Sequence, residues 1–120
     1  MQTTVYHNPR CSKSRATLQL LADRGVAATV VEYLKEPPNA ATLGKLAEAL
    51  DRPARDLVRT GQAEWKALGL DIDTANEADL FEAIATEPIL LQRPIVVVDD
   101  GAATRARIGR PPEDVLEILP

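Results

Sequence analysis

The order of the apolar patterns along the chain limits the folds that it can adopt. Residues 3–7 and 28–33 are short β-rich segments, and residues 12–24 between them carry apolar side chains at helical spacing. Gly25 stands where it would end that helix. A strand, a helix and a second strand in this order predict a right-handed crossover and a parallel pair of strands.

A second group of patterns lies toward the other end of the chain. Residues 95–98 (IVVV) are the strongest buried-strand pattern. The turn residues 99–101 (DDG) predict a hairpin to a partner strand over residues 103–108. Two consecutive prolines then open a last predicted helix over residues 113–119.

The segment between these two groups has only helical patterns. The order β-α-β, then helices, then β-β-α is the thioredoxin arrangement with an insertion. We therefore predict the α/β fold class, with a single thioredoxin-like domain over residues 1–120 and a helical insertion at about 39–87. Pro94, directly before the 95–98 strand, occupies the place of that fold's cis-proline.

The composition excludes several classes of function. The chain is 45% hydrophobic and 27% charged, which is typical of a globular domain. A net charge of −4, one Trp, one Phe and two Tyr argue against binding to nucleic acid. The first residues lack a signal-peptide pattern, and no apolar run approaches the ~18 residues of a membrane span. We expect a cytoplasmic protein with no membrane partner.

Cys11 is the only cysteine, and it lies in the sequence HNPRCSKSR (residues 7–15) after the first predicted strand. A loop that ends at a helix N-terminus places the sulfur near backbone N–H groups without intrahelical partners. Arg10, Lys13 and Arg15 add positive charge, and both effects favour the thiolate. A buried structural cysteine is the alternative, but it suits an apolar segment better than this polar loop.

A single cysteine also limits the chemistry. It cannot form a disulfide within the chain, and one cysteine with one histidine cannot supply a four-ligand zinc site. We therefore expect no bound metal or prosthetic group. A reaction that oxidises Cys11 needs an external thiol to restore it.

Five blocks of sequence carry a family resemblance. They are residues 6–15 (YHNPRCSKSR), 57–59 (LVR), 68–70 (LGL), 88–95 (PILLQRPI) and 108–113 (IGRPPE). With these blocks in order over essentially its full length, the chain resembles the arsenate reductases that work with glutathione and glutaredoxin. That family shares its fold with the Spx-type regulators of RNA polymerase.

The resemblance implies roles for particular residues. Cys11 matches the nucleophile, and His7 and Ser14 match the residues that tune its thiol. Arginines that bind and orient the oxyanion match Arg59, Arg93 and Arg110. Guanidinium groups suit arsenate, a tetrahedral anion with a charge of about −2. From the residues alone, His7 can instead hydrogen-bond the backbone at the strand end, and Ser14 can be a helix cap or a first-turn residue.

The reaction implied is the reduction of arsenate to arsenite through an adduct between the Cys11 thiol and arsenate. Glutathione would be a co-substrate rather than a bound cofactor, and glutaredoxin would resolve a mixed disulfide. We expect a monomer. The turn at 99–104 is longer than in the arsenate reductases compared, and longer family members carry a further tail beyond the position of Pro120.

Three other functions compete with this interpretation. A glutathione-dependent thiol reductase with another substrate would have the same fold. An Spx-type regulator commonly has a second cysteine in C-x-x-C, where this chain has Ser14. A phosphatase-like arsenate reductase would need an arginine six positions after the cysteine, where Thr17 stands, and is excluded.

Overall fold

The computed structural model describes residues 1–119 and contains a mixed four-stranded sheet in the order β2-β1-β3-β4. The strands are β1 (Gln2–His7), β2 (Thr29–Glu32), β3 (Ile95–Asp99) and β4 (Thr104–Ile108). The chain forms two compact units. The sheet unit comprises Met1–Glu36 and the segment from Arg93 onward, and the helical unit comprises Pro37–Gln92.

The pairing of the strands agrees with the sequence patterns. β1 pairs in parallel with β2, where Val5 lies opposite Val30, and in antiparallel with β3, where Val5 lies opposite Val96. β3 and β4 form the predicted hairpin. The Arg93–Pro94 peptide bond before β3 is cis, as expected for this position.

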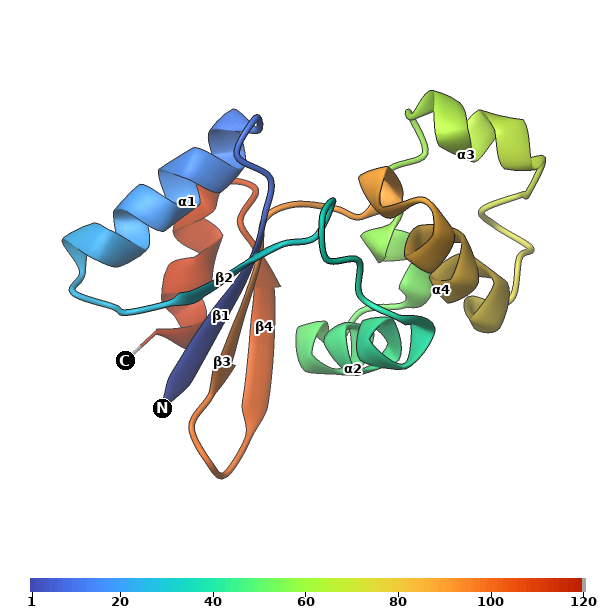
Figure 1. The fold of residues 1–120 in the computed structure, drawn as a ribbon. Helices are drawn as coiled ribbons and strands as arrows, with labels where there is room; N and C mark the ends of the chain where they lie inside the picture. The colour runs from blue at the N-terminus through green and yellow to red at the C-terminus, as the bar shows by residue number, and fades with distance from the viewer. Residues whose placement is uncertain (120) are drawn as a thin grey trace. The chain divides into compact units, whose positions relative to one another are not determined.

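One face of the sheet is covered by α1 (Ser12–Asp23) and the short 3₁₀ helix η3 (Pro112–Ile118), as Figure 1 shows. The buried apolar residues between the sheet and these helices are Val5, Leu21, Val96, Val98, Val115 and Ile118. Burying one such side chain stabilises a fold by about 1.5–3 kcal/mol. This core holds α1 against β1, so the loop that joins them is fixed at the C-terminal end of β1.

The helical unit consists of α2 (Ala40–Leu50), η1 (Ala54–Leu57), α3 (Ala63–Leu68), α4 (Glu77–Thr86) and η2 (Pro88–Leu90). Asn39 and Asn76 cap α2 and α4, because each side chain accepts a backbone N–H of the first turn at 2.8 Å. The unit encloses the predicted insertion at 39–87. That the whole chain is one domain with an insertion stays a prediction.

Candidate active site

The backbone around Cys11 makes it the N-terminal cap of α1. Its N–H donates to the Asn8 carbonyl at 3.0 Å, and its own carbonyl accepts the N–H of Arg15 at 3.0 Å. Its side chain makes no capping hydrogen bond. The half-buried sulfur therefore lies beside the first turn of the helix, where backbone N–H groups lack intrahelical partners.

These surroundings make the Cys11 thiol acidic. Burial alone would raise its pKa, but the N–H of Ser14, the Arg93 guanidinium, the N–H of Lys13 and the Ser14 hydroxyl outweigh burial and lower the pKa to about 7. About half of the thiol is then ionised at pH 7, against ~3% for an unperturbed cysteine. A thiolate population at neutral pH is the property that a nucleophilic cysteine needs.

Ser14 connects the thiol to the preceding loop. It is fully buried in the first turn of α1, and its hydroxyl accepts the N–H of Asn8 at 3.4 Å. Asn8 is also buried, and its Oδ1 accepts the N–H of Arg10 at 3.0 Å. Of the two structural alternatives for Ser14, the structure shows a first-turn residue, because Cys11 is the cap.

Arg93 and Arg110 lie close together at the end of the sheet where β3 begins and β4 ends. Arg110 follows β4 and donates from Nη1 to the Arg93 carbonyl at 3.1 Å. Arg93 itself is half-buried beside Cys11, and its Nε and Nη1 atoms are buried without a hydrogen-bond partner. Buried donors are nearly always paired in native proteins, so these two N–H groups indicate a site for an acceptor such as an oxyanion.

Arg59 lies in the helical unit rather than the sheet unit. It follows η1, and its N–H donates to the Leu90 carbonyl at 2.7 Å. Its role in binding the oxyanion stays a prediction. The same holds for the roles predicted for the other site residues, which are His7, Cys11, Ser14, Arg93 and Arg110.

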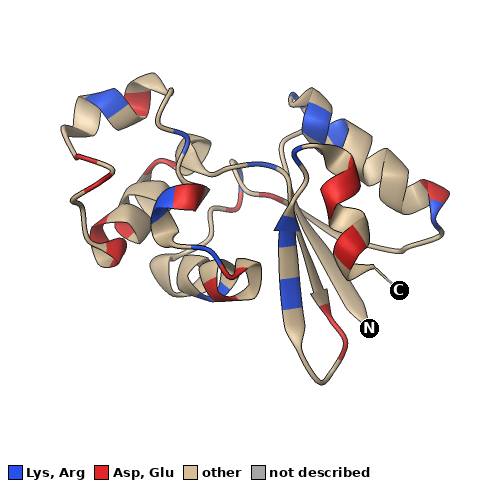
Figure 2. Ribbon diagram, turned by 180° about the vertical axis from the view of Figure 1, so that it is seen from behind, with Lys and Arg blue, Asp and Glu red and all other residues tan. Residues whose placement is uncertain are grey.

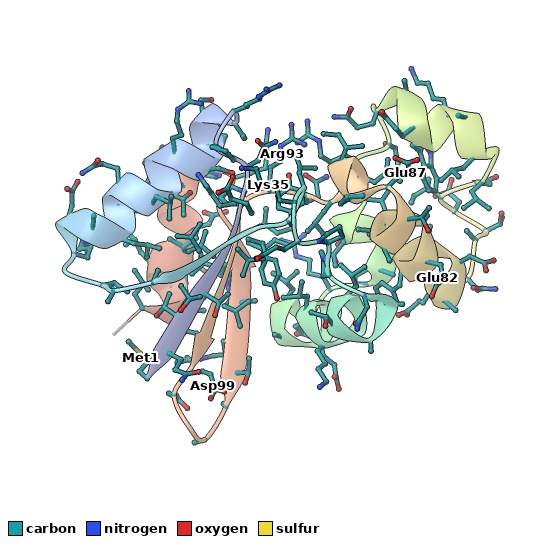
Figure 3. All side chains as sticks on the ribbon, viewed as in Figure 1. Met1, Lys35, Glu82, Glu87, Arg93 and Asp99 are labelled. Carbon is teal, nitrogen blue, oxygen red and sulfur yellow. The ribbon has the colours of Figure 1, made fainter. Side chains whose placement is uncertain are left out.

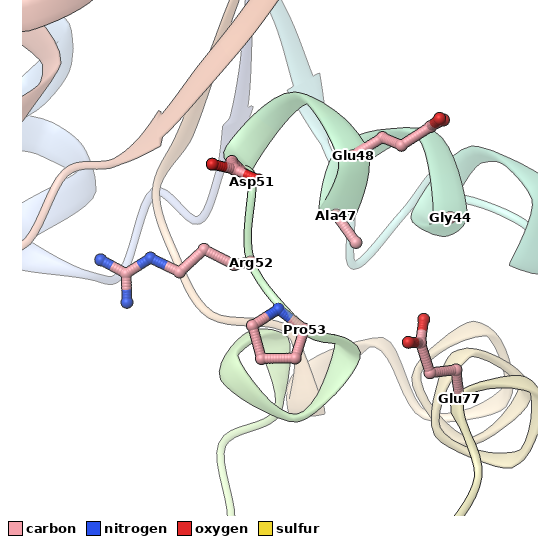
Figure 4. Close-up of a pocket in the computed structure, with 7 residues that line it drawn as sticks. All are labelled: Gly44, Ala47, Glu48, Asp51, Arg52, Pro53 and Glu77. Atoms are coloured by element: carbon pink, nitrogen blue, oxygen red, sulfur yellow. The ribbon is translucent and has the colours of Figure 1, made fainter.

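The charges divide unevenly between the two units, as Figure 2 shows. The sheet unit has nine Lys and Arg against eight Asp and Glu, whereas the helical unit has five against ten. Figure 4 shows a pocket of about 400 Å³ within the helical unit, lined by Glu48, Asp51 and Glu77 with Arg52 as its one cation. Carboxylates repel an anion, so the sheet unit is the better place for an oxyanion site.

His7 ends β1 and lies opposite Glu32 of β2. Its side chain is buried and its Nδ1 atom has no partner. Burial lowers the pKa of His7, Glu32 acts in the opposite direction, and Arg15 lowers it further. The ring is therefore mainly neutral at pH 7. The sequence left open that His7 hydrogen-bonds the backbone at the strand end. Its Nδ1 atom makes no such bond.

Tyr33 is a residue of this site that the sequence patterns did not select. It is fully buried directly after β2, and burial raises the pKa of its hydroxyl despite the nearby Arg93 and Asn8. The hydroxyl makes no hydrogen bond of ordinary geometry, although both neighbours lie close. The pattern of residues 28–33 predicted a strand but contained no signal for a place beside Arg93.

The family model described as the ArsC family matches residues 6–118, nearly the full chain. The chain belongs to the ArsC family. Among its relatives, the uncharacterized protein YfgD of Escherichia coli K12 is 48% identical over 98% of this chain and 97% of its own length. A protein of Neisseria meningitidis named arsenate reductase is 44% identical over 96% of each chain.

A solved structure supports the same assignment for this ArsC-family chain. The arsenate reductase from Vibrio cholerae is 42% identical, with a TM-score of 0.91 over 99% of this chain and 98% of its own. The predicted thioredoxin-like fold is therefore confirmed. Among residues 1–119, no helix combines the length and apolar character needed to cross a bilayer.

Replacing Ser14 with alanine is expected to raise the pKa of the Cys11 thiol above about 7, because the Ser14 hydroxyl helps to lower it. The thiol titrates from neutral to charged as pH rises, so alkylation by iodoacetamide at pH 6 should slow in the variant. The backbone N–H of Ser14 remains, so the rise should be partial. Ser12→Ala, an exposed serine of the same turn, is the control. Equal pH profiles for the two variants would contradict this role.

Gly109→Ala is expected to destabilise the fold by about 1–3 kcal/mol through overpacking. A Cβ at Gly109 would lie 2.6 Å from Thr17 Oγ1 and 2.9 Å from Pro94 Cγ. The Thr17 hydroxyl is held by the Lys13 carbonyl at 2.8 Å, and Pro94 is buried, so neither moves easily. Urea unfolding measures the change. Gly61→Ala, with nothing within 4 Å, is the control, and equal midpoints would disprove the clash.

Proposed function

We propose that this protein is an arsenate reductase that converts arsenate to arsenite with Cys11 as its nucleophile. The observation that carries the proposal is an acidic thiol, with a pKa of about 7, beside the buried and unpartnered N–H groups of Arg93. An anionic substrate would satisfy those donors and be held against the thiolate. The names of several relatives, in Neisseria meningitidis and Haemophilus influenzae among others, support the same activity.

The first step joins sulfur to arsenic. The Cys11 thiolate attacks As(V), an As–S bond forms, and one arsenic-bound oxygen leaves with protons as water. Repulsion between the thiolate and the anion opposes this step, and positive charge from Arg93 and Arg110 offsets it. Arg59 is proposed as the third guanidinium that binds the oxyanion.

The second step reduces the arsenic. A glutathione thiolate attacks the sulfur of Cys11, an S–S bond forms, and the electron pair of the As–S bond passes to arsenic, which leaves as arsenite. The thiolate of glutaredoxin then attacks the glutathione sulfur of the mixed disulfide, and Cys11 leaves as a thiolate. With one cysteine in the chain, the reducing thiols must be external. The proposal assigns the reaction to the reducing cytoplasm, where such thiols are abundant. It also treats the protein as a monomer.

The test is NADPH oxidation coupled through glutathione reductase, with the wild-type protein, arsenate, glutathione and glutaredoxin. NADPH consumption should require all four components, and arsenite should appear in a 1:1 ratio to NADPH. Omission of each component in turn supplies the controls. NADPH consumption that is independent of arsenate would refute the proposal.

A second candidate is a glutathione-dependent thiol reductase with another substrate. The relative YfgD, of uncharacterised function, is 48% identical, whereas the arsenate reductase of the same organism is 39% identical and is covered over only 80% of its length. In the same coupled assay without glutaredoxin, a small disulfide such as hydroxyethyl disulfide would then support turnover that depends on this protein, while arsenate would not. An Spx-type regulator is disfavoured, because Ser14 stands where a second cysteine would form the switch.

A further inference from the structure

A pocket of about 210 Å³ opens in the sheet unit next to the Cys11 loop. One wall consists of residues 7–10, which lead directly to Cys11. The other consists of Glu32, Leu34 and Lys35, at and after the end of β2. Figure 3 labels Lys35 and Arg93 at the end of the sheet unit where α1 begins. The mechanism above assigns no role to this pocket.

Strand pairing creates the pocket. His7 and Glu32 are paired at the ends of the parallel strands β1 and β2. The segments that follow them therefore leave the sheet at the same end. After Glu32 the chain turns, and the N–H of Lys35 donates to the Glu32 carbonyl at 2.9 Å. The space between the two segments is the pocket.

The pocket wall combines both signs of charge with a buried polar atom. Arg10 and Lys35 are cations, and Glu32 is an anion. Glu32 Oε1 lies 3.7 Å from Lys35 Nζ, with 79% of the lysine side chain exposed, so this ion pair is weak and can be exchanged for ligand contacts. His7, which is 6% exposed, has no partner for Nδ1. A ligand with an ammonium and a carboxylate group matches this set.

We propose that this pocket binds the zwitterionic amino-acid head of the small thiol that attacks Cys11. The inference rests on the proposed function in one respect, namely that an external thiol reacts at Cys11. In glutathione, the head is the α-ammonium and α-carboxylate of the γ-glutamyl residue. Glu32 would accept from the ammonium, while Arg10 and Lys35 would donate to the carboxylate.

The dimensions agree with this assignment. Pockets for drug-sized ligands usually exceed about 300 Å³, so this pocket fits one end of a tripeptide rather than all of it. The γ-glutamyl head and the sulfur of glutathione are separated by about two residue lengths, roughly 7 Å. The pocket wall includes Arg10, the residue before Cys11. A head bound there must therefore hold the thiol close enough to attack the Cys11 sulfur, which the exchange rates below test.

The glycine end of glutathione is a poorer occupant. It carries a carboxylate but no ammonium, so it would leave Glu32 and the unpartnered nitrogen of His7 without a new contact. The pocket therefore distinguishes thiols by their γ-glutamyl head. γ-Glutamylcysteine keeps that head and lacks glycine, whereas N-acetylcysteinylglycine keeps glycine, lacks the head and carries no ammonium group.

The test measures thiol–disulfide exchange without arsenate. The Cys11 thiolate of the reduced protein attacks the disulfide form of each thiol, which gives a mixed disulfide and releases one thiol. Intact-protein mass spectrometry measures the rate at which Cys11 reacts with each disulfide. Each rate is then divided by the rate at which free N-acetylcysteine reacts with the same disulfide, which gives the normalised rate. We expect similar normalised rates for the disulfides of glutathione and γ-glutamylcysteine, and a rate about 10-fold lower for that of N-acetylcysteinylglycine. Three equal normalised rates would overturn the proposal.

Variants locate the preference in the pocket. Glu32→Gln and Lys35→Gln should each lower the normalised rate with glutathione disulfide by about 10-fold and leave the N-acetylcysteinylglycine rate unchanged. Glu36→Gln, an exposed neighbour outside the pocket wall, is the control. An unchanged glutathione rate in Glu32→Gln would refute the assignment. Because arsenate is absent, failure of the arsenate assay and failure of this inference are separate results.

Discussion

Cys11→Ser is expected to abolish arsenate-dependent NADPH oxidation, with a loss of at least about 1,000-fold. A serine hydroxyl is scarcely ionised at neutral pH, and its oxygen cannot form the disulfide that returns electrons to the cycle. No other cysteine in the chain can replace it. The fold should be unaffected, because the substitution changes one half-buried atom that makes no capping hydrogen bond.

The coupled assay measures this loss, and mass spectrometry of the incubated protein provides a second readout. Wild type should accumulate a glutathione adduct when glutaredoxin is omitted, and Cys11→Ser should not. Ser12→Ala, one residue away and exposed, should keep the wild-type rate. A Cys11→Ser rate above one-hundredth of wild type, about 2.7 kcal/mol in activation free energy, would disprove the nucleophile assignment.

Arg93→Ala is expected to lower kcat/KM for arsenate by about 100-fold or more. The guanidinium acts in two ways. It helps to lower the pKa of the Cys11 thiol, and its buried N–H groups are the proposed donors to the oxyanion. The thiol pKa should therefore rise in the variant, which shifts the pH profile of alkylation upward. The loss in kcat/KM should exceed what reduced ionisation of the thiol explains.

Arg105→Ala is the matched control for Arg93→Ala. Arg105 lies on β4 with about half of its side chain exposed, and Asp100 is 3.8 Å away. Loss of this exposed charge should change kcat/KM by less than about threefold, because solvent screens it. If the two alanine variants had similar kcat/KM values, general positive charge rather than a specific oxyanion contact would explain the activity.

Local patterns were sufficient for most of the elements. The helix predicted over residues 12–24 is observed as α1, Ser12–Asp23, because apolar periodicity and the left-handed Gly25 are properties of the segment itself. The second strand, predicted over 28–33, is shorter in the structure. It extends only from Thr29 to Glu32, because β2 is an edge strand and pairs with just four residues of β1.

Near the end of the chain, too, tertiary packing rather than the local pattern sets the structure of the element. A helix was predicted over residues 113–119, and the structure has a 3₁₀ helix, Pro112–Ile118. Its position depends on packing Val115 and Ile118 against the sheet core rather than on helix propensity. Within the middle segment, whose patterns are all helical, residues 54–57 likewise form a 3₁₀ helix, η1.

The sequence by itself determined the candidate nucleophile and the helix whose first turn lies beside it. A lone cysteine in a polar loop before an amphipathic helix is a local feature, and the N–H groups that lower its pKa come from the next three residues. Only the tertiary structure decided what surrounds the sulfur. The family resemblance had selected Arg93, but only the pairing of β1 with β2 and β3 brings Arg93 and Tyr33 to the end of the sheet where Cys11 lies. Strand pairing joins residues distant in sequence, and the register that joins them is set by the whole core.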